Sequence, residues 1–222
     1  GSLFESENAG KAFPRAQLAG RLRRLAAQGI LIGGSSWKYP GWVGQIYTPE
    51  RYIVRGKFSR KRFQDTCLEE YAEVFPAVGA DFTFYQFPTP ADWEKLFHSA
   101  PATLVYGFKA PENITVHAWP KHARYGPRAG EYNPDFLNAE LFREAFLAPL
   151  EPYRPQVGCI MFEFGAFSPY VYETPSGFYQ DLDSFLAALP RDFHYGVEIR
   201  NEEYLTGEYL ECLHAHNVTH VI

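Results

Sequence analysis

The stretch Val157–Phe164, with the sequence Val-Gly-Cys-Ile-Met-Phe-Glu-Phe, predicts a β-strand, and Tyr179–Leu189 behind it predicts a helix. Side chains alternate between the two faces of a strand. One face is therefore expected to lie under helices and the other to face away from them. The helix-facing set is Ile160, Phe162 and Phe164, and the opposite set is Cys159, Met161 and Glu163.

The same order of strand and then helix recurs on both sides of this stretch. Such repetition is typical of parallel strands joined by crossover helices, so the expected fold class is α/β. The expected strands are 30–36, 81–87, 104–110, 157–164, 194–200 and a last one beginning at 218–222. The expected helices are 17–28, 65–75, 91–99, 139–150, 179–189 and 208–216.

Two α/β architectures fit this alternation, a doubly wound sheet and a barrel. Gly33-Gly34-Ser35-Ser36 is a weak match to a phosphate-binding turn, because aromatic residues and Pro40 follow where a helix should begin. The segments after the strands (37–64, 111–138, 165–178) are long, and those before them (76–80, 151–156, 190–193) are short. This asymmetry favours a TIM-type (β/α) barrel, which places long functional loops after its strands.

The expected domain organisation is a single barrel domain over residues 17–222. Residues 1–16 are expected to be a tag remnant and a frayed segment. The helix at 17–28 places leucines on one face, ends at Gly29 and is expected across the N-terminal end of the barrel. Because the chain stops inside strand six, either strands seven and eight are missing or the barrel is open. Of the two, we expect the first, a barrel truncated after the start of strand six.

Composition excludes several classes of protein. With 46% hydrophobic and 17% aromatic residues, the chain has enough apolar area to fold. No run of about 18 apolar residues predicts a membrane span, and no secretory signal opens the chain. Cys67, Cys159 and Cys212 are far apart and odd in number, which predicts reduced thiols and a cytoplasmic location. The oligomeric state is left open.

An ordered series of motifs extends over residues 30–222. It resembles the YecE-like family, domain of unknown function number 72. The resemblance implies a TIM-type barrel and no established reaction. The motifs are Ile32-Gly33-Gly34-Ser35-Ser36-Trp37-Lys38-Tyr39-Pro40-Gly41-Trp42, Gly44, Tyr47-Thr48-Pro49, Thr83-Phe84-Tyr85-Gln86-Phe87-Pro88, Trp93, Gly107-Phe108-Lys109-Ala110-Pro111, Ile114-Thr115 and Val197-Glu198-Ile199-Arg200-Asn201.

The chain also departs from the family's pattern. Gly79-Ala80-Asp81 stands where the family usually has Glu-x-Asn, and Glu163-Phe164-Gly165 replaces its Gln-Leu-Pro. The family's Thr-His pair is separated here, as Thr115-Val116-His117. Tyr204 stands where the family has Trp. These departures identify a divergent member.

Charged residues end three of the expected strands on the face away from the helices. Lys109, Glu163, Glu198 and Arg200 should therefore meet at the C-terminal mouth of the barrel, where such barrels have their active sites. The leading hypothesis is that a polar or anionic small molecule binds there. Glu163 and Glu198 are candidate acid and base of a hydrolase, Lys109 is an anion anchor or nucleophile, and Arg200 binds substrate. The alternative is a salt-bridge cluster that fills the mouth.

Four aromatic residues are candidate walls of this pocket. Trp37, Tyr39, Trp42 and Tyr85 could stack on a sugar or a base, or they could belong to the core.

Metal and cofactor sites have little support. No catalytic elbow, P-loop or zinc pattern is present, and the seven histidines are scattered. We expect no metal and no cofactor, with one weak exception. His117 and His122 lie in a long segment that could bring them to Glu163 as a divalent-metal site.

A basic segment supports a second functional hypothesis. Residues 51–62 contain six Lys and Arg and no acid, although the net charge of the chain is −5. They lie in the segment after the first strand, on the side of the mouth, and could guide a phosphate backbone there. The alternative function is therefore nucleic-acid binding or processing, through Arg55, Lys57, Arg60, Lys61 and Arg62. A solvated loop would explain the same residues.

Overall fold

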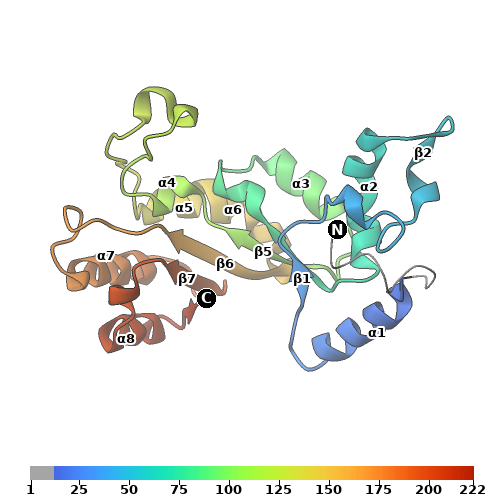
Figure 1. Cartoon of the computed structure of the whole chain (residues 1–222). Coiled ribbons are helices and arrows are strands. Elements are labelled where there is room, and N and C mark those ends of the chain that lie inside the picture. The colour runs from blue at the N-terminus through green and yellow to red at the C-terminus, as the bar shows by residue number, and fades with distance from the viewer. Residues whose placement is uncertain (1–12) are drawn as a thin grey trace, which may run out of the picture. The chain divides into compact units, whose positions relative to one another are not determined.

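The computed structural model describes residues 13–222, which form two compact units. Unit 1 comprises residues 13–78 and 98–104, and unit 2 comprises residues 79–97 and 105–222. Most of the expected tag remnant and frayed segment lies outside the described residues. Its last part does not: Arg15 and Ala16 belong to the first helix (Figure 1).

Unit 1 contains two helices, a short hairpin and the beginning of the main sheet. The helix predicted at 17–28 is confirmed as α1, and it ends before Gly29, whose φ of +82° is readily adopted by glycine. The Ser59 side chain accepts a hydrogen bond from the Arg62 backbone N–H and so caps α2. The elements are α1 (Arg15–Ala26), β1 (Gly33–Gly34), β2 (Ile53–Val54), β3 (Lys57–Phe58), α2 (Arg60–Ala72) and the start of β4 (Ala77–Ala80).

The glycine motif has a packing role in unit 1. Gly33 pairs with Ala77 in parallel register, and a Cβ at Gly33 would lie 1.9 Å from the Ala77 carbonyl oxygen. Only glycine allows β1 to approach β4 this closely. Only Gly33–Gly34 of the strand predicted at 30–36 pairs with a neighbouring strand.

Unit 2 contains the remaining strands and helices. The strand predicted at 157–164 is confirmed with the same bounds. The helix predicted at 139–150 is present, with a π-helical turn at Arg143–Leu147 in its middle. The elements are α3 (Pro90–His98, of which His98 is counted with unit 1), β5 (Val105–Lys109), α4 (Glu112–Thr115), α5 (Ala139–Phe142), α6 (Ala148–Leu150), β6 (Val157–Phe164), α7 (Pro175–Ala187), β7 (Tyr195–Ile199), α8 (Gly207–Ala215) and β8 (Thr219–His220).

The strand predicted at 81–87 is wrong. Residues Asp81–Phe84 form a 3-10 turn, η3, and the strand is β4 at Ala77–Ala80, immediately before it. The physical reason is strand pairing. Ala77 and Val78 pair with β1, and the aromatic residues of 81–87 take no part in this pairing.

The six main strands follow the order β1-β4-β5-β6-β7-β8, and the described pairings are parallel. The α/β class and the parallel sheet are therefore confirmed. β1 and β8 stand at opposite ends of this order, so over residues 13–222 the sheet is open and is not a closed barrel. The hairpin β2–β3 forms a separate antiparallel pair.

In unit 2 the hydrophobic core lies on one face of the sheet. The Phe108 ring is 5.0 Å from Trp93 of α3, and the Phe162 ring is 5.2 Å from Phe142 of α5. The Phe164 ring lies 5.2 Å from Phe178 of α7. The alternation predicted for β6 is confirmed, because Cys159, Met161 and Glu163 are only half-buried. β5 alternates in the same way, and Glu198 is the half-buried residue of β7.

No helix within residues 13–222 has the length and apolar character needed to cross a membrane. The three cysteines carry free thiols. The expected cytoplasmic location stays a prediction.

Candidate functional site

Charged side chains from three neighbouring strands and one turn converge in unit 2. Lys109 ends β5, Glu163 and Glu198 lie near the ends of β6 and β7, and Arg200 follows β7. Glu163 and Glu198 are directly opposite each other in the parallel register, so their side chains project on the same face. Asp81 joins them from η3. The sequence prediction that the four strand-end residues meet is therefore matched by their ion pairs.

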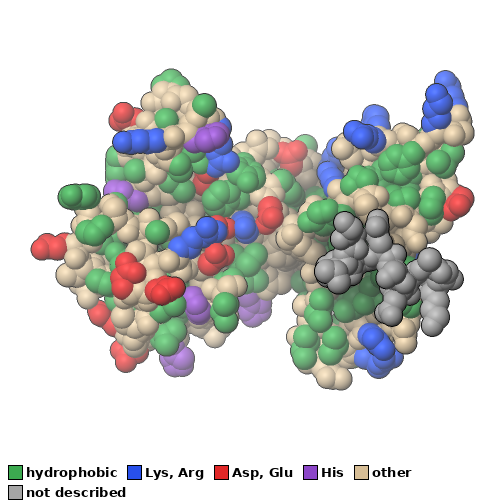
Figure 2. Space-filling view, in the orientation of Figure 1, with side chains coloured by type: hydrophobic (Ala, Val, Ile, Leu, Met, Phe, Trp, Pro, Cys, Tyr) green, Lys and Arg blue, Asp and Glu red, His purple; other side chains and the backbone are tan. Residues whose placement is uncertain are grey.

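Glu163 is the centre of this charged cluster. Its Oε2 is 2.8 Å from Lys109 Nζ, and its Oε1 is 2.7 Å from Arg200 Nη2. Two contacts are longer: Lys109 Nζ lies 3.7 Å from Asp81 Oδ1, and Arg200 Nε lies 3.7 Å from Glu198 Oε1. The Glu163 side chain is 15% exposed and that of Arg200 is 61% exposed. Blue and red side chains accordingly gather on the visible face of unit 2 (Figure 2).

The cluster holds its lysine as a cation. The hydrogen bond to Glu163 raises the pKa of Lys109, and partial burial opposes this only in part. A nucleophilic lysine needs a lowered pKa. The environment of Lys109 therefore favours its predicted role as a binding cation over its predicted role as a nucleophile.

The four predicted aromatic walls lie in different surroundings. Trp37, Tyr39 and Trp42 belong to unit 1, where Trp37 is buried and its carbonyl oxygen accepts a hydrogen bond from Tyr47. The Trp42 ring packs 4.7 Å from Tyr39 and 5.9 Å from Phe75. Tyr85 belongs to unit 2 and is exposed. An aromatic wall over the charged cluster stays a prediction.

A second polar network in unit 2 was not found by sequence reasoning. Glu112, buried at the start of α4, accepts hydrogen bonds from Arg124 Nη2 at 2.7 Å and from the Tyr125 hydroxyl at 2.8 Å. The Arg124 guanidinium also lies 4.8 Å from the centroid of the Tyr85 ring. In the sequence, the only indication of this network was that Glu112 stands close to the motif residue Lys109, separated from it by Ala110 and Pro111.

The two histidines considered for a metal site have different surroundings. His122 Nδ1 accepts a hydrogen bond from the Arg124 backbone N–H and caps the turn η4 (Ala123–Arg128). His117 instead lies near aromatic rings of unit 2. Over residues 13–222 no group of three or more His, Cys, Asp and Glu side chains is arranged to hold a metal ion. The expectation of no metal and no cofactor stays a prediction.

The basic segment of unit 1 is divided between paired and solvent-facing side chains. Arg51 Nη2 is 3.0 Å from Glu73 Oε1, and Lys61 Nζ is 2.6 Å from Asp65 Oδ2. For Arg55, Lys57, Arg60 and Arg62, all of them exposed, no ion pair is found within the described part of the chain. Blue side chains mark the end of the hairpin labelled β2 in Figure 1 (Figure 2).

Comparison with known proteins identifies the family of this chain. The family model "Protein of unknown function DUF72" matches residues 31–222. The chain belongs to the DUF72 family. It is 28% identical over 176 residues to the UPF0759 protein YecE of Escherichia coli K12, covering 79% of this chain and 50% of that protein. It thus spans about half the length of the curated relatives it matches.

One solved DUF72 structure supports the fold. A crystal structure of a DUF72 family protein from Thermotoga maritima aligns with a TM-score of 0.55 at 20% identity, over 86% of this chain and 64% of that one. A crystal structure of a DUF72 family protein from Enterococcus faecalis aligns with a TM-score of 0.46 at 17% identity, over 70% and 57% of the two chains. The first likeness shows a shared fold and no activity.

In this DUF72 chain Asn201, the last residue of the motif at 197–201, has a structural role. Asn201 is buried, and its Oδ1 accepts a hydrogen bond from the Phe167 backbone N–H at 2.6 Å. Its Nδ2 donates to the Phe167 carbonyl at 3.1 Å and to Glu203 Oε1 at 2.7 Å. Asn201 therefore ties the segment after β6 to the end of β7, beside Arg200 of the charged cluster.

Proposed function

We propose that the charged cluster binds a small hydroxylated molecule and that the protein acts on it as a hydrolase. The observation that carries this proposal is the convergence of Asp81, Lys109, Glu163, Glu198 and Arg200 at the C-terminal ends of parallel strands. In α/β proteins ligands bind at this edge of the sheet.

The charges of the cluster favour a neutral polar ligand over an anion. Three carboxylates face two cations, so the cluster has no surplus positive charge to attract an anion. A hydroxyl group both donates and accepts hydrogen bonds, so adjacent hydroxyls on a sugar-like molecule can donate to Asp81 or Glu198 and accept from Lys109 or Arg200.

The two glutamates are proposed to have different roles. Each oxygen of Glu163 is within 2.8 Å of a cation, so Glu163 positions Lys109 and Arg200. Glu198 is 3.7 Å from Arg200 Nε and keeps oxygen lone pairs for a ligand. Glu198 is therefore the proposed general acid or base, and Lys109 and Arg200 are the proposed substrate-binding cations.

We also propose that the sheet is part of a (β/α) barrel. Two observations support this: helices cover one face of β5, β6 and β7, and the charged cluster lies on the other face at the C-terminal ends of these strands. That is the division between the outer and inner faces of a barrel strand.

Ligand-observed NMR with methyl glucoside, glucosamine and glucose 6-phosphate tests the binding step. We expect methyl glucoside to bind and glucose 6-phosphate to bind at least tenfold more weakly. A panel of 4-nitrophenyl glycosides tests hydrolysis, and Glu198→Gln should slow the turnover of a hydrolysed glycoside about 100-fold or more.

Glu94→Gln on α3, an exposed carboxamide exchange outside the cluster, is the matched control and should leave binding and turnover unchanged. Equal binding of all three sugars, no turnover of any glycoside, or equal turnover by Glu198→Gln and the unaltered protein would contradict the proposal.

A second candidate function is nucleic-acid binding by unit 1. The observation that favours it is the group of exposed basic side chains Arg55, Lys57, Arg60 and Arg62 on the hairpin and the first turn of α2. Arg60 and Lys38 also line a pocket of about 290 Å³. Phosphate oxygens would take the place of the missing carboxylate partners.

A fluorescent single-stranded oligonucleotide titrated at several salt concentrations tests this function. Lys57→Ala/Arg60→Ala/Arg62→Ala should weaken binding at low salt and reduce the slope of log affinity against log salt by about 0.7 for each lost contact. The matched control removes three exposed arginines of α1, in Arg21→Ala/Arg23→Ala/Arg24→Ala. The same loss of affinity in both variants would reject a specific role for the hairpin.

A further inference from the structure

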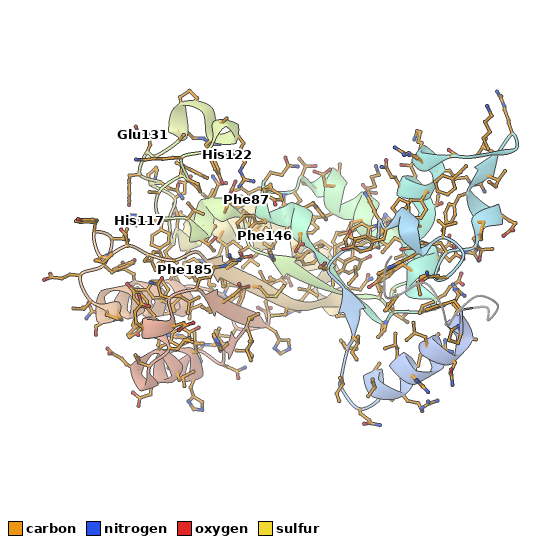
Figure 3. All side chains as sticks on the ribbon, in the orientation of Figure 1. Phe87, His117, His122, Glu131, Phe146 and Phe185 are labelled. Carbon is orange, nitrogen blue, oxygen red and sulfur yellow. The ribbon has the colours of Figure 1, made fainter. Side chains whose placement is uncertain are left out.

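A second pocket, of about 460 Å³, lies in unit 2 away from the charged cluster. Its wall is formed by the segment between α4 and α5, by the segment before α7 and by α7 itself. His117 comes from the first of these and Phe185 from α7 (Figure 3). A cavity of this size suits a small organic ligand. The residues of the pocket that carry the argument are His117, Tyr132, Phe136, Tyr172 and Asp181.

Three aromatic rings surround the imidazole of His117. The ring centroids of Tyr132 and Phe136 are each 5.2 Å from that of His117, and the Tyr172 ring is 6.4 Å away. Aromatic faces attract a cation through their quadrupole, and also bind apolar groups. These rings therefore suit a ligand that combines an apolar body with a positive charge.

Two side chains that can accept hydrogen bonds, His117 and Asp181, line the pocket. His117 Nδ1 is buried, and no hydrogen-bond partner is found for it among the described residues. Burial lowers the pKa of His117, and the charge of Asp181 opposes this only in part, so burial favours the neutral form of the ring. A neutral imidazole protonated at Nε2 presents Nδ1 as an acceptor. A buried polar atom left without a partner costs free energy that a donating ligand would recover.

Asp181 is the charged group of the pocket. Its Oδ2 accepts a hydrogen bond from the Tyr172 hydroxyl at 2.8 Å. No hydrogen bond to its Oδ1 is found within residues 13–222, so this oxygen is free to bind a donor. No Lys or Arg lines the pocket. The pocket therefore has acceptors, a negative charge and aromatic rings, and it lacks a group that would bind an anion.

We propose that this pocket binds a small primary amine with an apolar body. Its ammonium group donates hydrogen bonds to His117 Nδ1 and Asp181 Oδ1 and contacts the rings of Tyr132 and Tyr172. Its apolar part packs on Phe136 and Phe185. The site is separate from the charged cluster of the proposed function and shares no residue with it.

Benzylamine, with benzyl alcohol as its neutral analogue, is the probe that tests this. Titration of the ¹⁵N-labelled protein with benzylamine should give a saturable shift of the His117 ring nitrogens, and benzyl alcohol should bind at least tenfold more weakly. Asp181→Asn removes the charge and keeps an oxygen for the Tyr172 hydroxyl, and it should weaken benzylamine binding at least tenfold.

Asp183→Asn is the matched control, because Asp183 is on the same helix but contacts His216, with Oδ1 2.7 Å from Nε2. It should leave benzylamine affinity unchanged. His117→Phe keeps an aromatic ring and should abolish the selectivity for the amine, with circular dichroism used to verify folding. No shift of the His117 nitrogens at 10 mM benzylamine, equal binding of benzyl alcohol, or full affinity in Asp181→Asn would overturn the proposal.

Discussion

At the scale of single residues, Glu70 shows how far the surroundings of two identical neighbours can differ. Glu69 and Glu70 are adjacent in α2, yet Glu69 is exposed and Glu70 is buried. Glu70 accepts hydrogen bonds from the backbone N–H and hydroxyl of Thr48 and, at 2.7 Å, from the Tyr52 hydroxyl. This carboxylate joins α2 to the segment before the hairpin, and the helical pattern alone did not single it out.

We predict that Glu70→Gln lowers the free energy of unfolding by about 2 kcal/mol, because an amide satisfies the three donors less well than a buried carboxylate. Urea denaturation monitored by circular dichroism measures this. Glu69→Gln on the same helix should change stability by less than about 0.5 kcal/mol. Equal effects of the two variants would mean that Glu70 does not form the buried hydrogen bonds with Thr48 and Tyr52.

At the scale of elements, the long connection between α4 and α5 is organised by a buried asparagine. It is the yellow-green excursion in Figure 1, and it includes η4 and carries His117. Asn133 Nδ2 donates to the carbonyl oxygens of Asn113 at 2.8 Å and Val116 at 2.6 Å, and its Oδ1 accepts from the Asp135 N–H. The Asn133 backbone N–H also donates to the His117 carbonyl oxygen at 2.9 Å, so Asn133 holds the His117 backbone at the edge of the second pocket.

Asn133→Ala is expected to loosen this connection, because two carbonyl groups and one N–H lose their partners. Amide hydrogen exchange over residues 116–137 should become at least tenfold faster, with little change in β5, β6 and β7. Asn113→Ala is the matched control, since Asn113 contributes its carbonyl oxygen and not its side chain to this contact. Unchanged exchange in Asn133→Ala would contradict the described role.

At the scale of the whole molecule, the sheet is open over the described residues and its strands have unequal faces. Phe162 on β6 is fully buried against helices, and its neighbour Met161 is half-buried on the other face. In a closed and filled barrel both faces would be buried. The loss of unfolding free energy when Phe162 or Met161 is truncated therefore shows how well each face of the sheet is covered.

We expect Phe162→Ala to lower the unfolding free energy by about 3–5 kcal/mol and Met161→Ala by about 1 kcal/mol. The shift in the midpoint of urea unfolding measures both. A loss for Met161→Ala as large as that for Phe162→Ala would show that the second face is also buried in solution, and would argue against an open sheet.

The amino-acid sequence alone determined the α/β class, the bounds of β6, the buried faces of β5, β6 and β7, and the family resemblance. These properties depend on local alternation and on ordered motifs, both of which can be read within a few residues. It also placed Lys109, Glu163, Glu198 and Arg200 at one end of the sheet, because parallel strands share their C-terminal edge.

Only the tertiary structure decided the features that depend on contacts between distant residues. The strand predicted at 81–87 lies instead at Ala77–Ala80. Pairing with Gly33–Gly34 determines where this strand forms, and the aromatic composition of 81–87 does not. The tertiary structure made Glu163 the shared partner of Lys109 and Arg200, and it brought His117 near Asp181 across a long separation in the chain. A local pattern carries no information about which distant group will neutralise a charge or leave a buried nitrogen without a partner.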